Sequence, residues 1–135
     1  SKPLLDRIDI FTETIILKYG EISNSDKGEN SYNVRKRIEK VHHIQKERYK
    51  NDGILFNSEL SAGMIKRYCV MDNEAKEYLE NIFENMEFSA RAYHKVLKTA
   101  RTIADMDESG EIKRKHISEA VCYRTADKKY WGVTM

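Results

Sequence analysis

Apolar positions recur at helical spacing along most of the chain, and most regularly between residues 89 and 105. Counted from the first of them, they fall at offsets of three, four, seven, ten and eleven: Tyr93, Val96, Leu97, Ala100, Ile103 and Ala104. This spacing places the six side chains on one face of an α-helix. Ser89 is a preferred N-cap residue, so the helix is predicted to begin directly after it. The stripe is the strongest core pattern in the sequence.

The same periodicity predicts further helices on both sides of this one. One covers residues 31–50 and ends where Asn51, Asp52 and Gly53 tolerate the left-handed conformation. Ser61 and Asp72 are candidate N-caps of two more helices, and the last helix covers about residues 114–125. Their inward positions are Val34, Ile38, Val41, Ile44 or Gln45, Met64, Ile65, Tyr68, Cys69, Ala75, Tyr78, Leu79, Ile82, Phe83, Ile117, Ala120 and Val121. We therefore expect an all-α fold, a small bundle of four to five helices.

Residues 8–16 have a different pattern. Ile8, Ile10 and Thr12 alternate with polar residues in a stretch rich in β-branched side chains, which predicts a β-strand. No second strand pattern follows, and a strand without partners is only marginally stable. We expect an orphaned N-terminal strand segment, which either belongs to a sheet outside these residues or is poorly ordered. Residues 18–31 are rich in Gly, Ser and Asn and are expected to form a loop.

Length and charge restrict the picture only in part. A chain of 135 residues fits one domain with one core. Its 24 Lys and Arg against 22 Asp and Glu leave a net charge of +2, which by itself favours neither nucleic acid nor membrane. The charges are segregated, however: residues 35–50 carry a net +5 and residues 72–87 a net −5. Such blocks most often form solvated helix faces that complement one another.

Cysteines, histidines and hydropathy argue against several classes of protein. Cys69 and Cys122 have no metal-ligand or disulfide spacing and are interpreted as small core residues in a reducing compartment. His42 and His43 diverge by about 100° on a helix, so no metal site is predicted, and the histidines are interpreted as surface residues. The longest apolar run, residues 15–17, is too short to cross a membrane. We expect a cytoplasmic protein without membrane contact.

Arg91 stands in the first turn of the helix that follows Ser89, where the helix dipole favours negative charge. The unpaired N–H groups of that turn also favour an anion. Arg91 falls on the face opposite the apolar stripe, so it is presented to solvent. This setting indicates half of an anion site. The alternative is a surface ion pair with Glu87 or another acid of residues 72–87.

Several separated motifs resemble one family. SARAY (89–93) followed by ARTIAD (100–105) is similar to the sensor 2 helix in the lid subdomain of AAA+ ATPases, in particular the magnesium-chelatase-related family that includes the ComM-like competence proteins. LLDRID (4–9) resembles the family's segment before the last strand of the ATPase core. GENSYNVRKRIEKVHHIQKERY (28–49) resembles the first lid helix, and HISEAVCYR (116–124) resembles the closing helix. The matches lie in the family's order and cover nearly the whole chain.

The resemblance implies roles for two arginines in ATP hydrolysis. Arg91 matches sensor 2, a lid cation that contacts the γ-phosphate of ATP and moves the lid on hydrolysis. Arg7 matches the arginine finger, which reaches into the neighbouring subunit's site. A guanidinium suits both roles because its planar fork holds phosphate oxygens bidentately and keeps its charge. For Arg7 the alternative is a local ion pair with Asp6 or Asp9 near a frayed terminus.

The same resemblance implies that the rest of the ATPase lies elsewhere. The sequence contains no Gly-x-x-x-x-Gly-Lys-Ser/Thr loop and no apolar strand ending in paired acids. We expect the catalytic core to precede Ser1 in a longer protein, an expectation that the missing initiator Met also favours. Residues 1–20 are then a remnant of the last strand of the AAA+ core, and residues 21–135 are the helical C-terminal lid domain. ATP and Mg²⁺ would bind the full-length protein, whereas the 135-residue chain would bind neither and have negligible ATPase activity.

The implied partners are the AAA+ core of the same chain and identical subunits in a ring, expected to be a hexamer. DNA is a further possible partner, because the resembled family includes DNA-remodelling motors and residues 35–50 are basic. Against DNA contact, no glycine-rich or aromatic stacking platform accompanies this helix, and a helix at residues 72–87 can balance its charge.

Two other functions stay open at this point. The chain can be a stand-alone helical module that binds DNA or protein without nucleotide chemistry, or the true magnesium-insertion subunit of chlorophyll synthesis. FSARA (88–92) and TIAD (102–105) favour the chelatase-related group over the latter. Arg101 and Arg124 are interpreted as residues of a solvated face or a salt bridge. Residues 130–131 either dock on the bundle or mark where further sequence follows.

Overall fold

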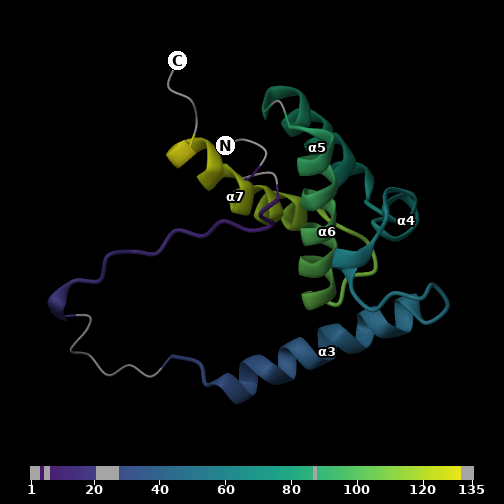
Figure 1. Cartoon of the computed structure of the whole chain (residues 1–135), viewed down its shortest axis with the longest axis horizontal. Helices are drawn as coiled ribbons and strands as arrows, with labels where there is room; N and C mark the ends of the chain where they lie inside the picture. The colour runs from purple at the N-terminus through teal and green to yellow at the C-terminus, as the bar shows by residue number, and fades with distance from the viewer. Residues whose placement is uncertain (1–3, 5–6, 21–27, 87, 132–135) are drawn as a thin grey trace.

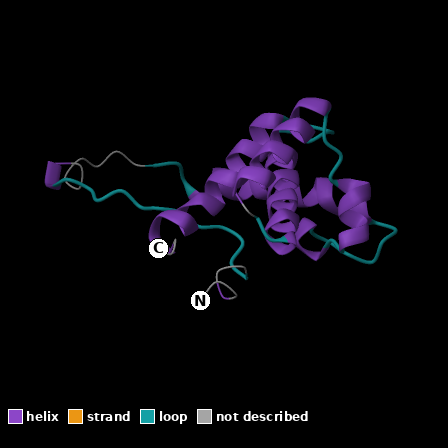
Figure 2. Cartoon of the chain, turned by 90° about the horizontal axis from the view of Figure 1, so that it is seen from above, coloured by secondary structure: helices purple, strands orange, loops and turns teal. Residues whose placement is uncertain are grey.

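The computed structural model describes residues 4, 7–20, 28–86 and 88–131, and for residues 125–131 the backbone alone. Within these ranges the fold is all-α, as predicted, with five α-helices of more than one turn and no strand (Figures 1 and 2). In chain order the elements are α3 (Ser31–Tyr49), the 3-10 turn η1 (Asn57–Glu59), α4 (Ala62–Tyr68), α5 (Asn73–Met86), α6 (Ala90–Met106) and α7 (Arg114–Trp131).

Helix α6 is the centre of the bundle. It contacts α7, α3, η1 and α4, while α5 packs against α7 (Figure 1). Four residues of the predicted stripe, Val96, Leu97, Ala100 and Ala104, are buried, and Tyr93 and Ile103 are half-buried against the same core. The small side chains of Ala100 and Ala104 allow the neighbouring helices to approach α6 closely. The hydrophobic stripe therefore forms the core as its spacing predicts.

Two apolar residues predicted to face inward are more exposed than expected. Ile38 keeps 42% of its surface exposed, because the N-terminal half of α3 projects beyond the bundle (Figure 1). Phe83 keeps 36% exposed and packs edge-on against the ring of Tyr93, with 5.4 Å between centroids. Periodicity assigns a face to each residue, but burial also requires a neighbouring helix at that point.

Three N-caps are formed at the residues that the sequence predicts. The side chain of Ser61 accepts a hydrogen bond from the Met64 N–H (3.4 Å), Asp72 from that of Ala75 (2.8 Å), and Ser89 from that of Ala92 (3.1 Å). The Ala75 N–H, and secondarily Lys113, hold the pKa of the Asp72 carboxyl below its ordinary value. Gly53 has φ +70° in the turn after α3, a conformation that glycine adopts without strain.

The strand predicted at residues 8–16 is not formed. Residues 7–18 run without regular structure; the Phe11 N–H donates to the Tyr123 carbonyl (2.9 Å), and Ile15 and Ile16 are 87% and 92% exposed (Figure 2). A strand needs a neighbouring strand to pair its backbone groups, and the described residues contain no such strand. Half of the predicted loop at 18–31, residues 21–27, lies outside the described residues.

Three further expectations, all concerning α7, are corrected. The helix continues to Trp131, beyond the predicted end at residue 125, because no glycine or proline interrupts residues 114–131. His116, interpreted as a surface residue, is 1% exposed: its Nδ1 accepts the Lys113 N–H (2.9 Å) and its Nε2 lies 3.0 Å from the Asp107 carboxylate. Cys69 is buried as predicted, but Cys122 is exposed.

None of the helices in the described ranges is both long and apolar enough to span a bilayer.

Candidate anion-binding site

Arg91 lies in the first turn of α6 and is exposed, on the side away from the core. That turn contains no acidic residue. Within the part of the chain that the structure describes, the Arg91 side chain forms no ion pair and no hydrogen bond, so the alternative pairing with α5 is absent there. The other alternative partner, Glu87, lies outside the described residues.

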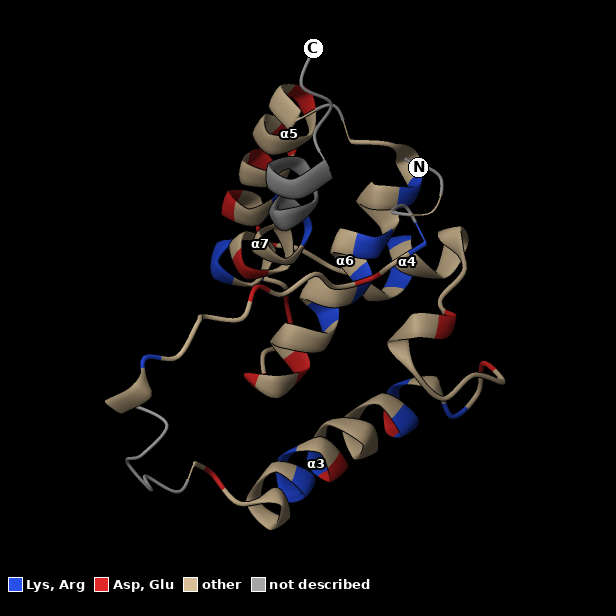
Figure 3. Cartoon of the chain, turned by 60° about the vertical axis from the view of Figure 1, so that its left-hand side comes forward, with Lys and Arg blue, Asp and Glu red and all other residues tan. Residues whose placement is uncertain are grey.

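Arg91 does not stand alone on this face of α6. Lys95 and Lys98 follow it by four and seven residues, which places all three on one side of the helix. Together with Arg7 and His94 they line an open hollow of about 530 Å³, completed by Ala90. The lining thus brings four permanent positive charges together and includes no acidic residue. Figure 3 shows the N-terminal segment passing beside α6, to which Lys95 connects it.

Arg7 reaches this hollow from the N-terminal segment. Its side chain is exposed, and its backbone carbonyl accepts a hydrogen bond from the Lys95 ammonium (2.7 Å). The predicted alternative, an ion pair of Arg7 with Asp9, is not formed, because Asp9 pairs with Lys95 (2.5 Å). Asp6 lies outside the described residues. The structure therefore places Arg7 and Arg91, which lie far apart in sequence, on the same hollow.

The chemistry of this hollow suits a multiply charged anion. A guanidinium at a helix start acts together with the free N–H groups of the first turn. Lys98, whose ammonium also donates to the Ser58 carbonyl (2.9 Å), adds positive charge two turns away. The phosphates of a nucleotide fit such a lining. The described residues do not form a site for Mg²⁺, because they contain no group of three or more His, Cys, Asp or Glu side chains that could hold a metal.

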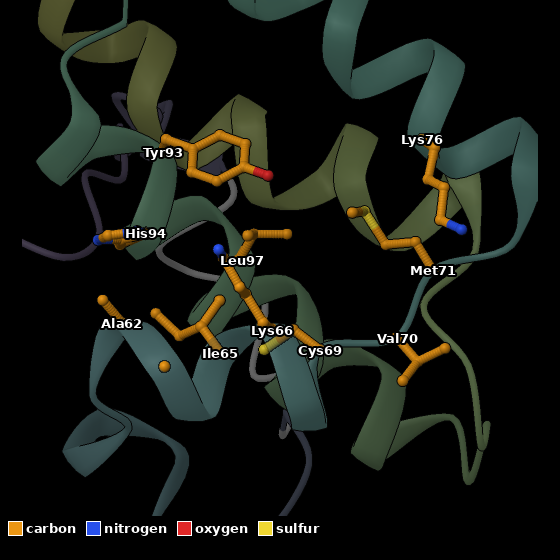
Figure 4. Close-up of a pocket in the computed structure, with 11 residues that line it drawn as sticks. Ala62, Ile65, Lys66, Cys69, Val70, Met71, Lys76, Tyr93, His94 and Leu97 are labelled. Atoms are coloured by element: carbon orange, nitrogen blue, oxygen red, sulfur yellow. The ribbon is translucent and has the colours of Figure 1, made fainter.

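A second pocket of about 460 Å³ opens between α4, the start of α5 and α6 (Figure 4). Its walls are mainly apolar, with Ile65, Met71 and Leu97 among the lining residues, and two lysines, Lys66 and Lys76, also line it. Burial raises the pKa of the Cys69 thiol in this pocket to about 11. The thiol is therefore protonated at neutral pH and is a poor nucleophile there.

Sequence reasoning missed a buried polar cluster at the other end of α6. Arg101 and Asp105 are both 1% exposed and form an ion pair (3.0 Å). Arg48 of α3 donates to Asp105 in a bidentate contact, and Asn57 of η1 donates to it at 2.9 Å. Arg101 also donates to the carbonyls of residues 109 and 110. Of the two interpretations of Arg101, the structure selects the salt bridge, and the Arg-x-x-x-Asp spacing within α6 was its signal.

The cluster ties α3 to α6 through charge. Burial lowers the pKa of the Arg48 guanidinium, but hydrogen bonds to Asp105 and its negative charge outweigh this effect, so the pKa lies above its ordinary value. Other basic residues of α3 pair with Glu29 and with Glu108. In the described residues the charge of α3 is thus answered by acids other than those of α5, contrary to the complementarity predicted for residues 35–50 and 72–87.

Arg124 is also buried, with 4% of its surface exposed. Its guanidinium donates to the Ile8 carbonyl and lies over the Phe11 ring, 5.4 Å from the centroid. These contacts connect α7 to the segment that carries Arg7. No local pattern in the sequence marks this role, because residues 8 and 124 are brought together only by the fold.

Comparison with known proteins places these features in a family context. Residues 28–124 match the C-terminal region of the magnesium chelatase subunit ChlI. This range contains Arg91, whereas Arg7 lies N-terminal to it.

Individual relatives are similar over almost the whole chain. An uncharacterized protein, YifB of Salmonella typhimurium, is 37% identical over 129 residues, which cover 95% of this chain and 25% of the relative. Competence protein ComM of Haemophilus influenzae is 38% identical over 125 residues, which cover 92% of this chain and 24% of the relative. YifB of Escherichia coli is 35% identical over 129 residues, with coverage of 95% and 25%. The chain therefore spans about a quarter of the length of these relatives.

Proposed function

This chain belongs to the family of the magnesium chelatase ChlI C-terminal region, with competence protein ComM among its relatives, and we propose that it is the C-terminal lid domain of a magnesium-chelatase-related AAA+ ATPase. In this proposal Arg91 is the sensor 2 residue and Arg7 is the arginine finger. The AAA+ core of the same polypeptide supplies the phosphate loop and the ligands of Mg²⁺, and identical subunits form a hexameric ring.

The setting of Arg91 is the observation that carries this assignment. Its guanidinium is exposed and has no partner among the described residues, at the start of a helix whose N–H groups favour an anion. The hollow beside it is lined by cationic and neutral residues only. An arginine placed for stability would be expected near an acid or near the C-terminal end of a helix.

The proposed mechanism assigns one task to each arginine. ATP, when bound, supplies the phosphoryl group that is transferred to water. Arg91 binds oxygens of the γ-phosphate, so that loss of this phosphate releases α6 and the helices packed on it from the core. Arg7 serves the neighbouring subunit's site, where its charge stabilises the negative charge that develops during transfer. In this proposal the two arginines of the hollow therefore face different nucleotides, Arg91 that of its own subunit and Arg7 that of the neighbour. Positive charge fixed in advance at both points lowers the barrier because it requires no rearrangement during the reaction.

Steady-state ATP hydrolysis by the full-length protein tests these roles. Arg7→Ala is expected to lower kcat by about 10³-fold with little change in nucleotide affinity, since a finger acts in the transition state. Arg91→Ala is expected to lower kcat by about 10²-fold and to weaken ATP binding as well. Lys66→Ala, on the apolar pocket, is the control and should keep wild-type turnover. Wild-type turnover in either arginine variant would refute its role.

The separate domain gives a second test. Because the phosphate loop lies in the AAA+ core in this proposal, the purified 135-residue chain should show no ATP hydrolysis above background. Robust turnover by this chain would contradict its assignment as a lid domain.

A second candidate function, DNA binding through α3, is favoured by one observation. The N-terminal part of α3 projects from the bundle (Figure 3). Arg35 and Lys46 are exposed, eleven residues apart on one face, without an ion-pair partner among the described residues. If α3 binds DNA, binding should weaken steeply with salt, and Arg35→Gln with Lys46→Gln should reduce its salt dependence by about two charges. Absence of binding at low salt would exclude this function and leave the lid role alone.

A further inference from the structure

We propose that Lys95 and Arg124 fasten residues 7–11, here called the Arg7 segment, onto α6 and α7, and that this fastening couples the position of Arg7 to that of Arg91. Both are positioning residues in this inference, which rests on the proposed function of the two arginines. The consequence is mechanical: a movement of α6 that follows loss of the γ-phosphate at Arg91 displaces the finger that serves the neighbouring site.

The first fastening comes from α6. Lys95 lies one turn after Arg91, and its ammonium donates to the Arg7 carbonyl (2.7 Å) and pairs with the Asp9 carboxylate (2.5 Å). Only 16% of the Lys95 side chain is exposed, although lysine is usually a solvated residue. One ammonium therefore bridges the two residues on either side of Ile8. Because the bond to residue 7 is made to its backbone, it holds the segment while leaving the Arg7 guanidinium free.

The second fastening comes from α7. Arg124 donates to the Ile8 carbonyl and lies over the Phe11 ring, while the Tyr123 carbonyl accepts the Phe11 N–H (2.9 Å). A guanidinium that is only 4% exposed would be costly to bury without such acceptors. Residues 7, 8, 9 and 11 are thus each held by a contact from one of two helices.

The two fastenings come from neighbouring helices. Helices α6 and α7 pack closely, and their small buried residues Ala100, Ala104 and Ala120 are each at most 1% exposed. Beyond Phe11 the segment leaves the bundle, and Ile15 and Ile16 are almost fully exposed.

A direct role of Lys95 in binding phosphate is the competing explanation, because Lys95 also lines the hollow. The two explanations differ in kinetics. A residue that binds ATP equally in the ground and transition states raises KM, whereas a residue that only positions the finger lowers kcat and leaves KM unchanged. They differ also in the coupling between substitutions. Replacing a residue that only positions Arg7 should have no effect on kcat once Arg7 itself has been removed.

The test uses the full-length protein with Lys95→Met, Lys95→Arg and the control Lys66→Met, each with and without Arg7→Ala. We expect Lys95→Met to lower kcat at least tenfold with KM for ATP within twofold, Lys95→Arg to restore most of the loss, and Lys95→Met to have no further effect in the Arg7→Ala background. A raised KM, an undiminished effect in that background, or wild-type kcat would each overturn the inference.

Tryptic cleavage after Arg7 under native conditions provides a readout that does not depend on hydrolysis. Loosening of the segment should speed this cleavage severalfold in Lys95→Met and in Arg124→Met, while Lys66→Met cleaves at the wild-type rate. If Arg7→Ala hydrolyses ATP normally, the proposed function fails, and accelerated cleavage still supports the fastening. If cleavage is unchanged in both variants, the fastening itself is refuted whatever the role of Arg7.

Discussion

The arginines of this domain differ in the partners of their guanidinium groups. Arg48 and Arg101 share the carboxylate of Asp105 in the interior, and Arg124 is satisfied by a backbone carbonyl and an aromatic ring. Arg7 and Arg91 are exposed beside one cationic hollow. Buried charges are retained where they have partners, so the first three residues serve the fold. The last two are exposed to a ligand at this hollow.

The Asp105 cluster makes the first prediction. Asp105→Ala removes the acceptor of two guanidinium groups and leaves them facing each other, and should lower the free energy of unfolding by about 3–5 kcal/mol. Urea unfolding of the 135-residue chain measures the change. The control is Glu108→Ala, whose ion pair with Lys40 is 61% exposed on both sides and should contribute less than about 1 kcal/mol. Equal effects of the two substitutions would show that the cluster does not hold α3 on α6.

The two cysteines make the second prediction. Cys122 is exposed, whereas Cys69 is buried and burial raises the pKa of its thiol to about 11. At pH 8 a thiol reagent should label Cys122 rapidly and Cys69 only as the chain unfolds, since the thiolate is the reacting species. Cys122→Ser should abolish the fast phase. Two fast phases in the native wild-type chain would be inconsistent with the position of Cys69 in the core.

At the level of whole elements, the helices begin where capping residues specify. The N-cap Asp72 of α5 yields the third prediction, a dependence of stability on pH. The Ala75 N–H holds the pKa of the folded-state carboxyl below its ordinary value of 3.8, so its contribution is present above that pH and is lost as pH falls through the lowered pKa. Asp72→Asn should destabilise the chain at pH 7 and approach the stability of the wild type as pH falls through the lowered pKa.

Ser89→Ala is the matched comparison for Asp72→Asn. It removes the N-cap of α6 and should cost about 1 kcal/mol, but with no pH dependence because a hydroxyl does not titrate in this range. Thermal unfolding between pH 2 and 7 distinguishes the two variants. A constant difference between Asp72→Asn and wild type across this range would contradict a charged cap at α5.

Helices could be predicted from the sequence because their signals are local. The stripe from Tyr93 to Ala104 and the caps at Ser61 and Ser89 depend on residues within a few turns of each other. The strand pattern at residues 8–16 forms no strand here, in agreement with the alternative of an orphaned, poorly ordered segment, since a strand also needs a partner that no local pattern supplies. For the same reason the burial of Arg101 and Arg124 was not foreseen: their partners include the loop after α6 and the N-terminal segment.

In the candidate site, too, some features follow from the local sequence and others depend on distant contacts. Exposure of Arg91 follows from its position opposite the stripe, and its place in the first turn follows from the Ser89 cap. That Arg7 lies at the same hollow does not follow from the sequence, because it depends on the contacts of Lys95 and Arg124 with residues more than 80 positions away. Resemblance to a family supplied the roles of the two arginines, and the fold supplied their proximity.

For the molecule as a whole, α6 connects the features that matter. Its first turn carries Arg91, its second holds the Arg7 segment through Lys95, and its C-terminal end is joined to α3 by the Asp105 cluster. The chain spans about a quarter of the length of its relatives. In the proposed function an AAA+ core supplies the rest of the ATP site. In this account the helices of the domain move together when the γ-phosphate is lost.

Binding of nucleotides to the full-length protein, measured at equilibrium with ADP and with a non-hydrolysable ATP analogue, tests this claim most directly. If Arg91 contacts the γ-phosphate, Arg91→Ala should weaken binding of the analogue at least tenfold and leave ADP binding within twofold, because only the analogue carries that phosphate. Lys66→Ala should change neither affinity. Equal affinities of Arg91→Ala and wild type for the analogue, or an equal loss for both nucleotides, would contradict the account.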